Sequence, residues 1–180
     1  MRAELASPDP ITEPKRYQEH LLGLLGDDDP AEVQAATPGL IRAILEQAGA
    51  DARTRPSLDE WSVLECVAHI VDAEIVYSGR YRWILAHDEP ELIGYDQDRW
   101  IAYLHDPLEE PEELLAIFEP LRHANLALWR RTPAASRDRV GLHRERGRES
   151  YDLSFRLIAG HDRFHLAQAR RALAELRRSA

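Results

Sequence analysis

Cysteine is almost absent from this sequence, because Cys66 is the only one in 180 residues. A single thiol excludes an intrachain disulfide and is compatible with a reducing cytosol. Long apolar runs are also missing: no stretch approaches the roughly 18 to 20 uninterrupted apolar residues that a membrane span needs. The N-terminus lacks the apolar centre of a secretory signal. We therefore expect a cytoplasmic protein with no membrane partner, in which Cys66 is a small core residue.

Basic residues are few relative to acidic ones. The chain has 23 lysine and arginine residues against 32 aspartate and glutamate residues, which gives a formal net charge of -9. Because affinity for nucleic acids depends on neutralising phosphates, this balance argues against a nucleic-acid partner. The length, with 44% hydrophobic residues, suffices for one substantial core and is short for two. We expect an N-terminal arm over residues 1–14 and one domain over residues 15–178.

Apolar residues recur every three or four positions in five segments, which is typical of amphipathic helices. Thr37 followed by Pro38 has the pattern of an N-cap and first helical position, and Ser62 with Glu65 has the pattern of a capping box. Pro120 lies inside a further segment and should kink or divide that helix. The expected helices run from about residue 17 to 25, 37 to 49, 63 to 86, 111 to 132 and 152 to 177.

Extended structure has a weak signal in this sequence. We find no convincing β-hairpin, although the irregular stretch 140–150 contains Gly141 and Gly147 and could hide a short extended pair. Four long amphipathic helices without alternating strands predict an all-α fold, an up-and-down four-helix bundle. In such a fold, sites are built from side chains on facing helices.

Three histidines stand out by their spacing and position. His161 and His165 are four residues apart, which places their β-carbons about 5 to 6 Å apart on one helix face, close enough to share a metal ion. Both continue an apolar stripe and should point into the bundle, while His69 lies near the edge of the stripe on its own helix. Each could instead be a core residue bonded to a carboxylate or carbonyl. Together they favour a metal site.

Two segments resemble the DinB-like superfamily of metal-binding four-helix bundles. Residues 60–74, EWSVLECVAHIVDAE, are similar to the family's tryptophan, capping serine and helix with the first histidine, and residues 159–168, AGHDRFHLAQ, are similar to its final-helix signature. The resemblance covers residues 15–178. It implies that His69, His161 and His165 bind one divalent ion, which would be nickel, zinc or iron.

The same resemblance implies an activity and a partner. It points to an enzyme that transfers a low-molecular-weight thiol such as bacillithiol, mycothiol or glutathione to a small electrophilic molecule, or that hydrolyses such a molecule, and to a homodimer. One branch has glutamate and histidine where this chain has His161 and His165, so a mycothiol-dependent isomerase is a poorer match. The alternative is a non-enzymatic, metal-stabilised dimeric binding protein associated with stress; a blander alternative is a bundle whose histidines are only packed polar groups.

Further polar residues are weaker candidates for the site. Asp72 and Gln168 lie three residues from a histidine and could hydrogen-bond its imidazole or a bound water, although ordinary surface positions are as good an interpretation. His143 lies between glycines and could approach the metal as a mobile ligand or a base. Asp162 and Arg163 turn away from the histidines, which predicts an interhelical ion pair or surface groups.

Two other features predict contacts inside the bundle. Glu74 occupies a position where its helix should be apolar, and a buried carboxylate needs a partner, so we expect an arginine from a neighbouring helix. Tyr95, Asp96, Trp100 and Tyr103 cluster in the long connection before residue 111. Aromatic side chains in such a loop either roof a pocket or pack against the end of the bundle.

Overall fold

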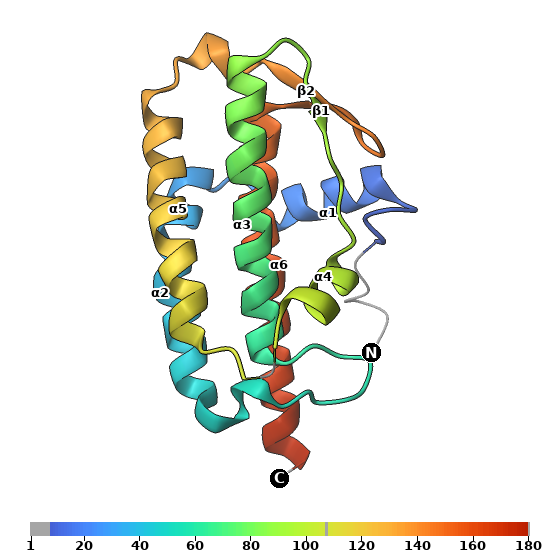
Figure 1. Cartoon of the computed structure of the whole chain (residues 1–180), viewed down its shortest axis with the longest axis vertical. Coiled ribbons are helices and arrows are strands. Elements are labelled where there is room, and N and C mark those ends of the chain that lie inside the picture. The colour runs from blue at the N-terminus through green and yellow to red at the C-terminus, as the bar shows by residue number, and fades with distance from the viewer. Residues whose placement is uncertain (1–7, 107, 180) are drawn as a thin grey trace.

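Four long helices form the body of the protein. Its structure is a computed structural model, which describes residues 8–106 and 108–179. These helices are α2 (Pro30–Ala48), α3 (Val63–Ala86), α5 (Pro111–Arg131) and α6 (Tyr151–Ser179). They lie side by side along the long axis (Figure 1). The predicted four-helix bundle is confirmed. No helix in the described part of the chain is long and apolar enough to cross a membrane.

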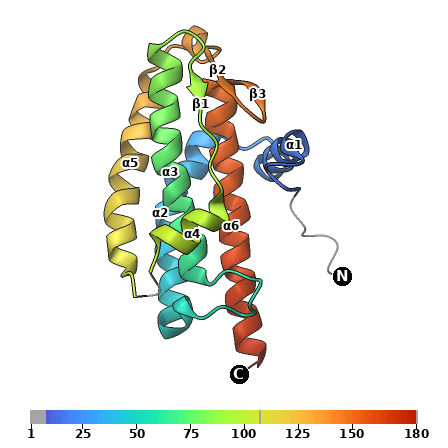
Figure 2. The same cartoon turned by 45° about the vertical axis from the view of Figure 1, so that its right-hand side comes forward.

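The connection after α3 determines in which direction α5 runs relative to α3. The pairs α2/α3 and α5/α6 each alternate in direction, as in an up-and-down bundle (Figure 1). Residues 87–106 and 108–110 return along the side of the bundle, so α3 and α5 run the same way (Figures 1 and 2). This returning segment contains β1 (Glu91–Leu92) and α4 (Gln97–Leu104), and it covers the face of α3 that carries His69.

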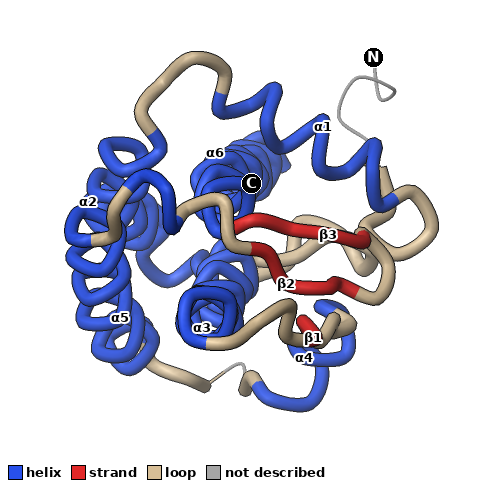
Figure 3. Tube along the Cα trace, turned by 90° about the horizontal axis from the view of Figure 1, so that it is seen from above, coloured by secondary structure: helices blue, strands red, loops and turns tan. Residues whose placement is uncertain are grey.

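The shorter helix α1 (Pro14–Leu25) crosses the outside of α6 (Figure 3). Its contact with α6 is close at Gly160, where an added β-carbon would lie 2.0 Å from the carbonyl oxygen of Leu21. Glycine is therefore required there for α1 to reach this position. Residues 1–7 of the predicted arm lie outside the described residues, and in the turn before α1 the carboxylate of Asp9 accepts from the backbone N–H of Thr12 at 2.7 Å.

Helix α2 begins eight residues earlier than predicted, with Asp29 and Pro30 in the places expected for Thr37 and Pro38. Its N-cap is Asp29, whose carboxylate accepts from the backbone N–H of Ala31. Pro38 has no N–H to donate to the carbonyl of Gln34, one turn back. Arg122 of α5 donates to that carbonyl instead, at 3.0 Å. The start predicted at Thr37 is therefore wrong, because a tertiary contact replaces the hydrogen bond that proline removes.

The other helix boundaries follow their local signals. Helix α3 starts after Ser62, and the capping box with Glu65 is present, with bonds of 3.2 and 2.8 Å. Helix α5 runs from Pro111 to Arg131 without division at Pro120. Pro120 is exposed, as is Ala116, whose carbonyl loses its partner. Because Ala116 is exposed, the missing N–H leaves no buried residue without a partner, and the helix is not divided.

The irregular stretch 140–150 does contain an extended pair. Strands β2 (Val140–His143) and β3 (Gly147–Ser150) are antiparallel, and β1 pairs in parallel with β2. The φ of Gly147 is 77°, a left-handed conformation that glycine adopts readily. Two short 3₁₀ helices, at Gly49–Arg53 and Ala134–Ser136, complete the described elements. The small sheet lies toward one end of the bundle (Figures 1 and 2).

A buried ion cluster joins three helices of the bundle. Arg122 of α5 forms ion pairs with Glu74 of α3 at 2.9 Å and with Asp162 of α6 at 2.6 Å, and all three side chains are buried. The predicted arginine partner of Glu74 and the interhelical pairing of Asp162 are confirmed. Arg163 faces α1, where it donates to the carbonyl of Leu24 at 2.8 Å. Cys66 is fully buried in the apolar core, as expected.

Candidate metal centre

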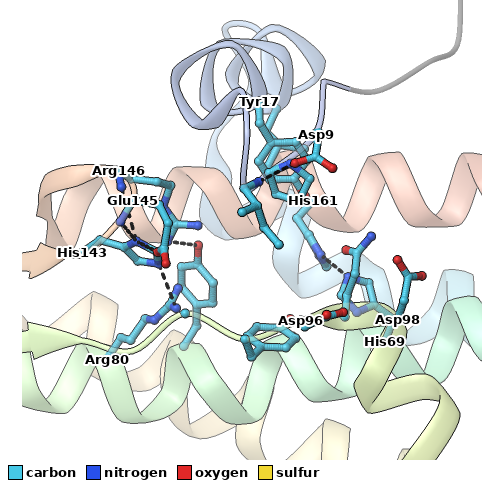
Figure 4. Close-up of a pocket in the computed structure, with 17 residues that line it drawn as sticks. Asp9, Tyr17, His69, Arg80, Asp96, Asp98, His143, Glu145, Arg146 and His161 are labelled. Atoms are coloured by element: carbon cyan, nitrogen blue, oxygen red, sulfur yellow. Dashed lines mark hydrogen bonds and ion pairs between the residues drawn. The ribbon is translucent and has the colours of Figure 1, made fainter.

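Two adjacent helices bring the three predicted histidines together. His69 projects from α3, His161 and His165 project from α6, and all three side chains are buried. One possible ligand atom from each ring lies within 4.8 Å of the other two. The Nε2 atoms of His69 and His161 are 3.0 Å apart and face each other (Figure 4). Two nitrogens that each lie about 2.0 to 2.1 Å from one ion would have a separation of about this size.

The hydrogen bonds of His165 leave one nitrogen free for a ligand. Its Nδ1 lies 2.9 Å from Oε1 of Gln168, and an amide oxygen can only accept, so Nδ1 donates. The other nitrogen, Nε2, is buried and has no hydrogen-bond partner among the described residues. A buried, unpartnered acceptor is costly. A metal ion would satisfy it, and the carbonyl of Gln168 would fix the ring as outer partners of metal-binding histidines do.

Burial keeps all three imidazoles neutral. It lowers the pKa of His69 and of His161 well below the usual 6.5, and the neighbouring histidines lower both further. Burial also lowers the pKa of His165 to about 4, although the bond to Gln168 acts in the opposite direction. Neutral imidazoles have a free lone pair, which metal binding requires. Three neutral nitrogen donors suit zinc, nickel and iron.

Aromatic rings surround the cluster. The ring of Trp61, just before the N-cap of α3, lies 5.2 Å from the ring of His69 and 6.0 Å from that of His165, measured between centroids. The ring of Tyr95, from the returning segment, lies 6.2 Å from that of His69. The capping box at the start of α3 therefore also sets the position of one wall of the site.

A cavity of about 270 Å³ opens beside His69 and His161. The returning segment contributes Tyr95 and Asp96 to its lining, in agreement with the predicted roof, and Trp100 packs against Tyr95 at 4.5 Å between ring centroids. Tyr103 points away, with 78% of its surface exposed. Side chains of α1, α3, β2 and the β2–β3 turn also line the cavity and include Tyr17, Leu21, Tyr77, Arg80, His143 and Arg146.

The remaining candidates occupy different positions around the histidines. Gln168 contacts His165 directly. Asp72 instead bonds His105 at 3.0 Å, and with Glu109 on the other ring nitrogen it raises the pKa of His105 to about 9. His143 lines the cavity, but its Nε2 lies 3.2 Å from a guanidinium nitrogen of Arg80 and not in the cluster.

Sequence reasoning did not assign Arg80, Tyr77 or Arg146 to the cavity. Tyr77 and Arg80 could have been predicted to lie near the site, because they follow His69 on α3 by eight and eleven residues, and such steps return to about the same face of a helix. No comparable signal exists for Arg146, because it reaches the cavity through the β2–β3 turn. Gly160 marks the approach of α1, which a sequence pattern alone does not reveal.

A protein family is defined by this four-helix bundle with short extra helices and by the two segments that carry the three histidines. The profile of the DinB superfamily matches residues 31–169, and the chain belongs to this superfamily. The predicted resemblance is thereby confirmed.

Two relatives give this family membership a more specific context. The chain is 25% identical over 114 residues to a protein of Oceanobacillus iheyensis named "Putative metal-dependent hydrolase OB0413". The match spans 63% of this chain and 65% of that protein, a little under two thirds of its length. The fold is similar to that of YfiT from Bacillus subtilis, described as "a probable metal-dependent hydrolase with an unusual four-helix bundle topology". The TM-score is 0.73 at 21% identity, over 84% of this chain and 86% of that one.

Proposed function

We propose that this chain is a hydrolase of a small electrophilic molecule and depends on one divalent ion held by His69, His161 and His165. The observation that carries the proposal is the convergence of three buried imidazoles beside a cavity large enough for a small molecule. The names of the two relatives agree with hydrolysis. Nickel, zinc and iron are the candidate ions, because imidazole nitrogen suits all three.

The donor set fits an open metal site. Three protein ligands are typical of catalytic zinc centres, whereas structural centres are closed by a fourth. Among the described residues, the cluster contains three possible ligands, and Asp72 and His143 are bonded elsewhere. A divalent ion in such a site polarises a carbonyl or phosphoryl oxygen and lowers the pKa of a water or thiol.

The protein's own groups would have positioning roles. Gln168 holds the ring of His165 so that Nε2 faces the other histidines. Tyr95 and the turn before α1 cover the cavity and limit access of bulk water to His69 and His161. A substrate would enter between these segments and lie along α3.

Two alternatives remain for the same centre. In the first, a low-molecular-weight thiol such as bacillithiol, mycothiol or glutathione replaces water as the nucleophile, and the protein is a thiol S-transferase. In the second, the metal only stabilises a dimeric binding protein associated with stress. The absence of a fourth ligand among the described residues favours an enzyme over the second alternative.

One experiment separates these possibilities. Purified protein is chelated, reconstituted with nickel, zinc or iron, and assayed with activated esters, amides and phosphoesters, with and without each thiol. We expect hydrolysis that chelation abolishes, that the matching metal restores and that His165→Ala lacks. Thiol-dependent conjugate formation without hydrolysis would identify the transferase. No turnover with any substrate and metal would contradict both enzymatic proposals. His123→Ala, on the exposed face of α5, is the matched control.

We also propose one domain over residues 15–178, a cytoplasmic location and a homodimer. The residue range follows from the resemblance, and the family match over residues 31–169 supports it. Gel filtration with light scattering at micromolar concentration tests the dimer, and a monomer mass would contradict it. Fractionation of cells that express the chain tests its location.

A further inference from the structure

Two arginines of the bundle are equally buried but differ in their partners. Arg80 and Arg122 are each 1% exposed. The charge of Arg122 is matched by the carboxylates of Glu74 and Asp162. Arg80, on α3, forms no ion pair with a carboxylate in the part of the chain that the structure describes.

The partners that Arg80 does have are uncharged. Its Nη2 donates to the carbonyl of Ile93 at 2.5 Å and to Nε2 of His143 at 3.2 Å. Its guanidinium carbon lies 4.7 Å from the ring centre of Tyr77. Its Nε is buried and has no hydrogen-bond partner among the described residues. The guanidinium thus retains donor capacity that the protein does not use.

Two carboxylates of the β2–β3 hairpin are bound to other groups, although the charge of Arg80 helps that of Arg146 to lower the pKa of Glu149. Glu149 accepts from Arg146 at 2.7 Å and from the hydroxyl of Ser154 at 2.7 Å. Glu145 lies 3.0 Å from Nδ1 of His143. A buried charge without a partner is strongly unfavourable. An anion from outside the chain would complete the surroundings of Arg80.

Arg80 lies in the same cavity as the candidate metal ligands. His69 and Arg80 are eleven residues apart on α3, which places them on about the same face and about 16 Å apart along the helix axis. Arg80, His143 and Arg146 gather at one end of the cavity and His69 and His161 at the other (Figure 4).

The sign of the charge changes along the cavity. Asp96 and Asp98 are carboxylates on the histidine side (Figure 4). The far end has the two guanidinium groups of Arg80 and Arg146 and, among the described residues, a single carboxylate, that of Glu145, which lies 3.0 Å from Nδ1 of His143. An anionic molecule would therefore lie with its charged group at Arg80. Its uncharged part would extend toward His69.

We propose that Arg80 binds an anionic group, a carboxylate or a phosphate, of the substrate at the end of the cavity remote from the three histidines. The proposal rests on the proposed function for the meaning of "substrate", but the anion site itself does not require a metal. It assigns the substrate to small molecules with an acidic group separated from the reacting centre by an uncharged segment. Binding at a remote group of this kind holds the reacting part in position.

Calorimetric titration of the full-length protein tests the site directly. The probes are hexanoate, its neutral analogue hexanamide, and inorganic phosphate. We expect wild type to bind at least one of the two anions, with hexanamide at least about tenfold weaker than hexanoate if the carboxylate is the preferred group. Arg80→Met should weaken binding of the preferred anion at least about tenfold. Arg148→Met, an exposed arginine on β3 outside the cavity, should bind as wild type does.

Further measurements keep the test decisive. Circular dichroism establishes that each variant is folded, and Arg80→Lys, which keeps the charge, should bind the anion better than Arg80→Met. If Arg80→Met does not fold, the comparison of wild type with Arg80→Lys still applies, because lysine lacks the planar donor set and should bind the anion more weakly than arginine. Equal binding by Arg80→Met and wild type, or no saturable binding of either anion by wild type, would overturn the proposal.

The result is separable from the proposed function. Metal content and hydrolysis are measured on the same preparations. Anion binding that depends on Arg80, without any metal-dependent hydrolysis, would contradict the proposed function alone. Chelator-sensitive hydrolysis without anion binding would contradict the role of Arg80 alone.

Discussion

Replacement of Arg122 by methionine should destabilise the fold strongly. Arg122→Met keeps a long, flexible side chain but removes the charge that lies between Glu74 and Asp162. Both carboxylates are buried, so water cannot take over the role of the guanidinium. The carbonyl of Gln34 also loses the donor that compensates for Pro38.

The size of the effect follows from these losses. Removal of one partner from a buried ion pair costs about 3–5 kcal/mol. Here two carboxylates and one carbonyl lose their partner together, so we expect a decrease of about 5 kcal/mol in the free energy of unfolding. A typical domain has only about 5–15 kcal/mol in total. The variant should therefore retain at most about 10 kcal/mol, and it should be partly unfolded at 25 °C if the wild type is at the lower end of this range.

Urea denaturation followed by circular dichroism measures this decrease. A triple variant with Glu74→Gln and Asp162→Asn added should recover much of the stability, because it removes the uncompensated charges. Burial already raises the pKa of Asp162, so the deficit of Arg122→Met should shrink as the pH falls and this carboxyl becomes protonated. Arg42→Met, which removes an exposed ion pair between α2 and Glu119 of α5, should change stability little. A loss of less than about 1 kcal/mol in Arg122→Met would refute the reasoning.

Three further predictions concern other parts of the structure. Gly160→Ala should displace α1 and lower the free energy of unfolding, measured by urea denaturation, by about 1–3 kcal/mol, because the added β-carbon meets the backbone of Leu21. Gly39→Ala, with open space around the added β-carbon, should be neutral or stabilising. Equal effects of the two substitutions would contradict the close approach of α1. The pKa of His105 is raised to about 9 in the folded state, so its stabilising contribution is present below pH 6.5 and lost as the pH rises toward 9. His105→Gln should therefore flatten the dependence of the melting temperature on pH. An unchanged dependence would count against the pairing of His105 with Asp72 and Glu109. Gln168→Leu should weaken metal binding about 10–100-fold in a chelator competition, through the loss of the bond to His165, and unaltered affinity would exclude that role.

The helices were predictable where their signals are local. The start of α3 depends on Ser62 and Glu65, which lie three residues apart and bond each other whatever the rest of the chain does. The start of α2 was not predictable, because Thr37 and Pro38 imitate a helix start. Only the contact of Arg122 with the carbonyl of Gln34, from a residue far along the chain, makes proline tolerable inside that helix.

The residues of the candidate site, too, were predictable only where the signal is local. The spacing of His161 and His165 is a local property, and it correctly placed both rings in the interior. Asp72 lies three residues from His69, as Gln168 lies from His165, but Asp72 bonds His105 from the returning segment, a partner that no local pattern indicates. The surroundings of Arg80 likewise depend on β1, β2 and the turn after β2, which meet α3 only in the folded chain.

The central claim is that the three histidines hold a divalent metal ion, and elemental analysis of protein purified without a histidine tag or chelator tests it most directly. Wild type, His161→Ala, His165→Ala and the surface control His123→Ala are compared before and after reconstitution with nickel, zinc or iron. The account predicts about one equivalent of metal in wild type and in His123→Ala, and little in the other two variants. No metal in wild type after reconstitution, or equal metal in all four proteins, would contradict it.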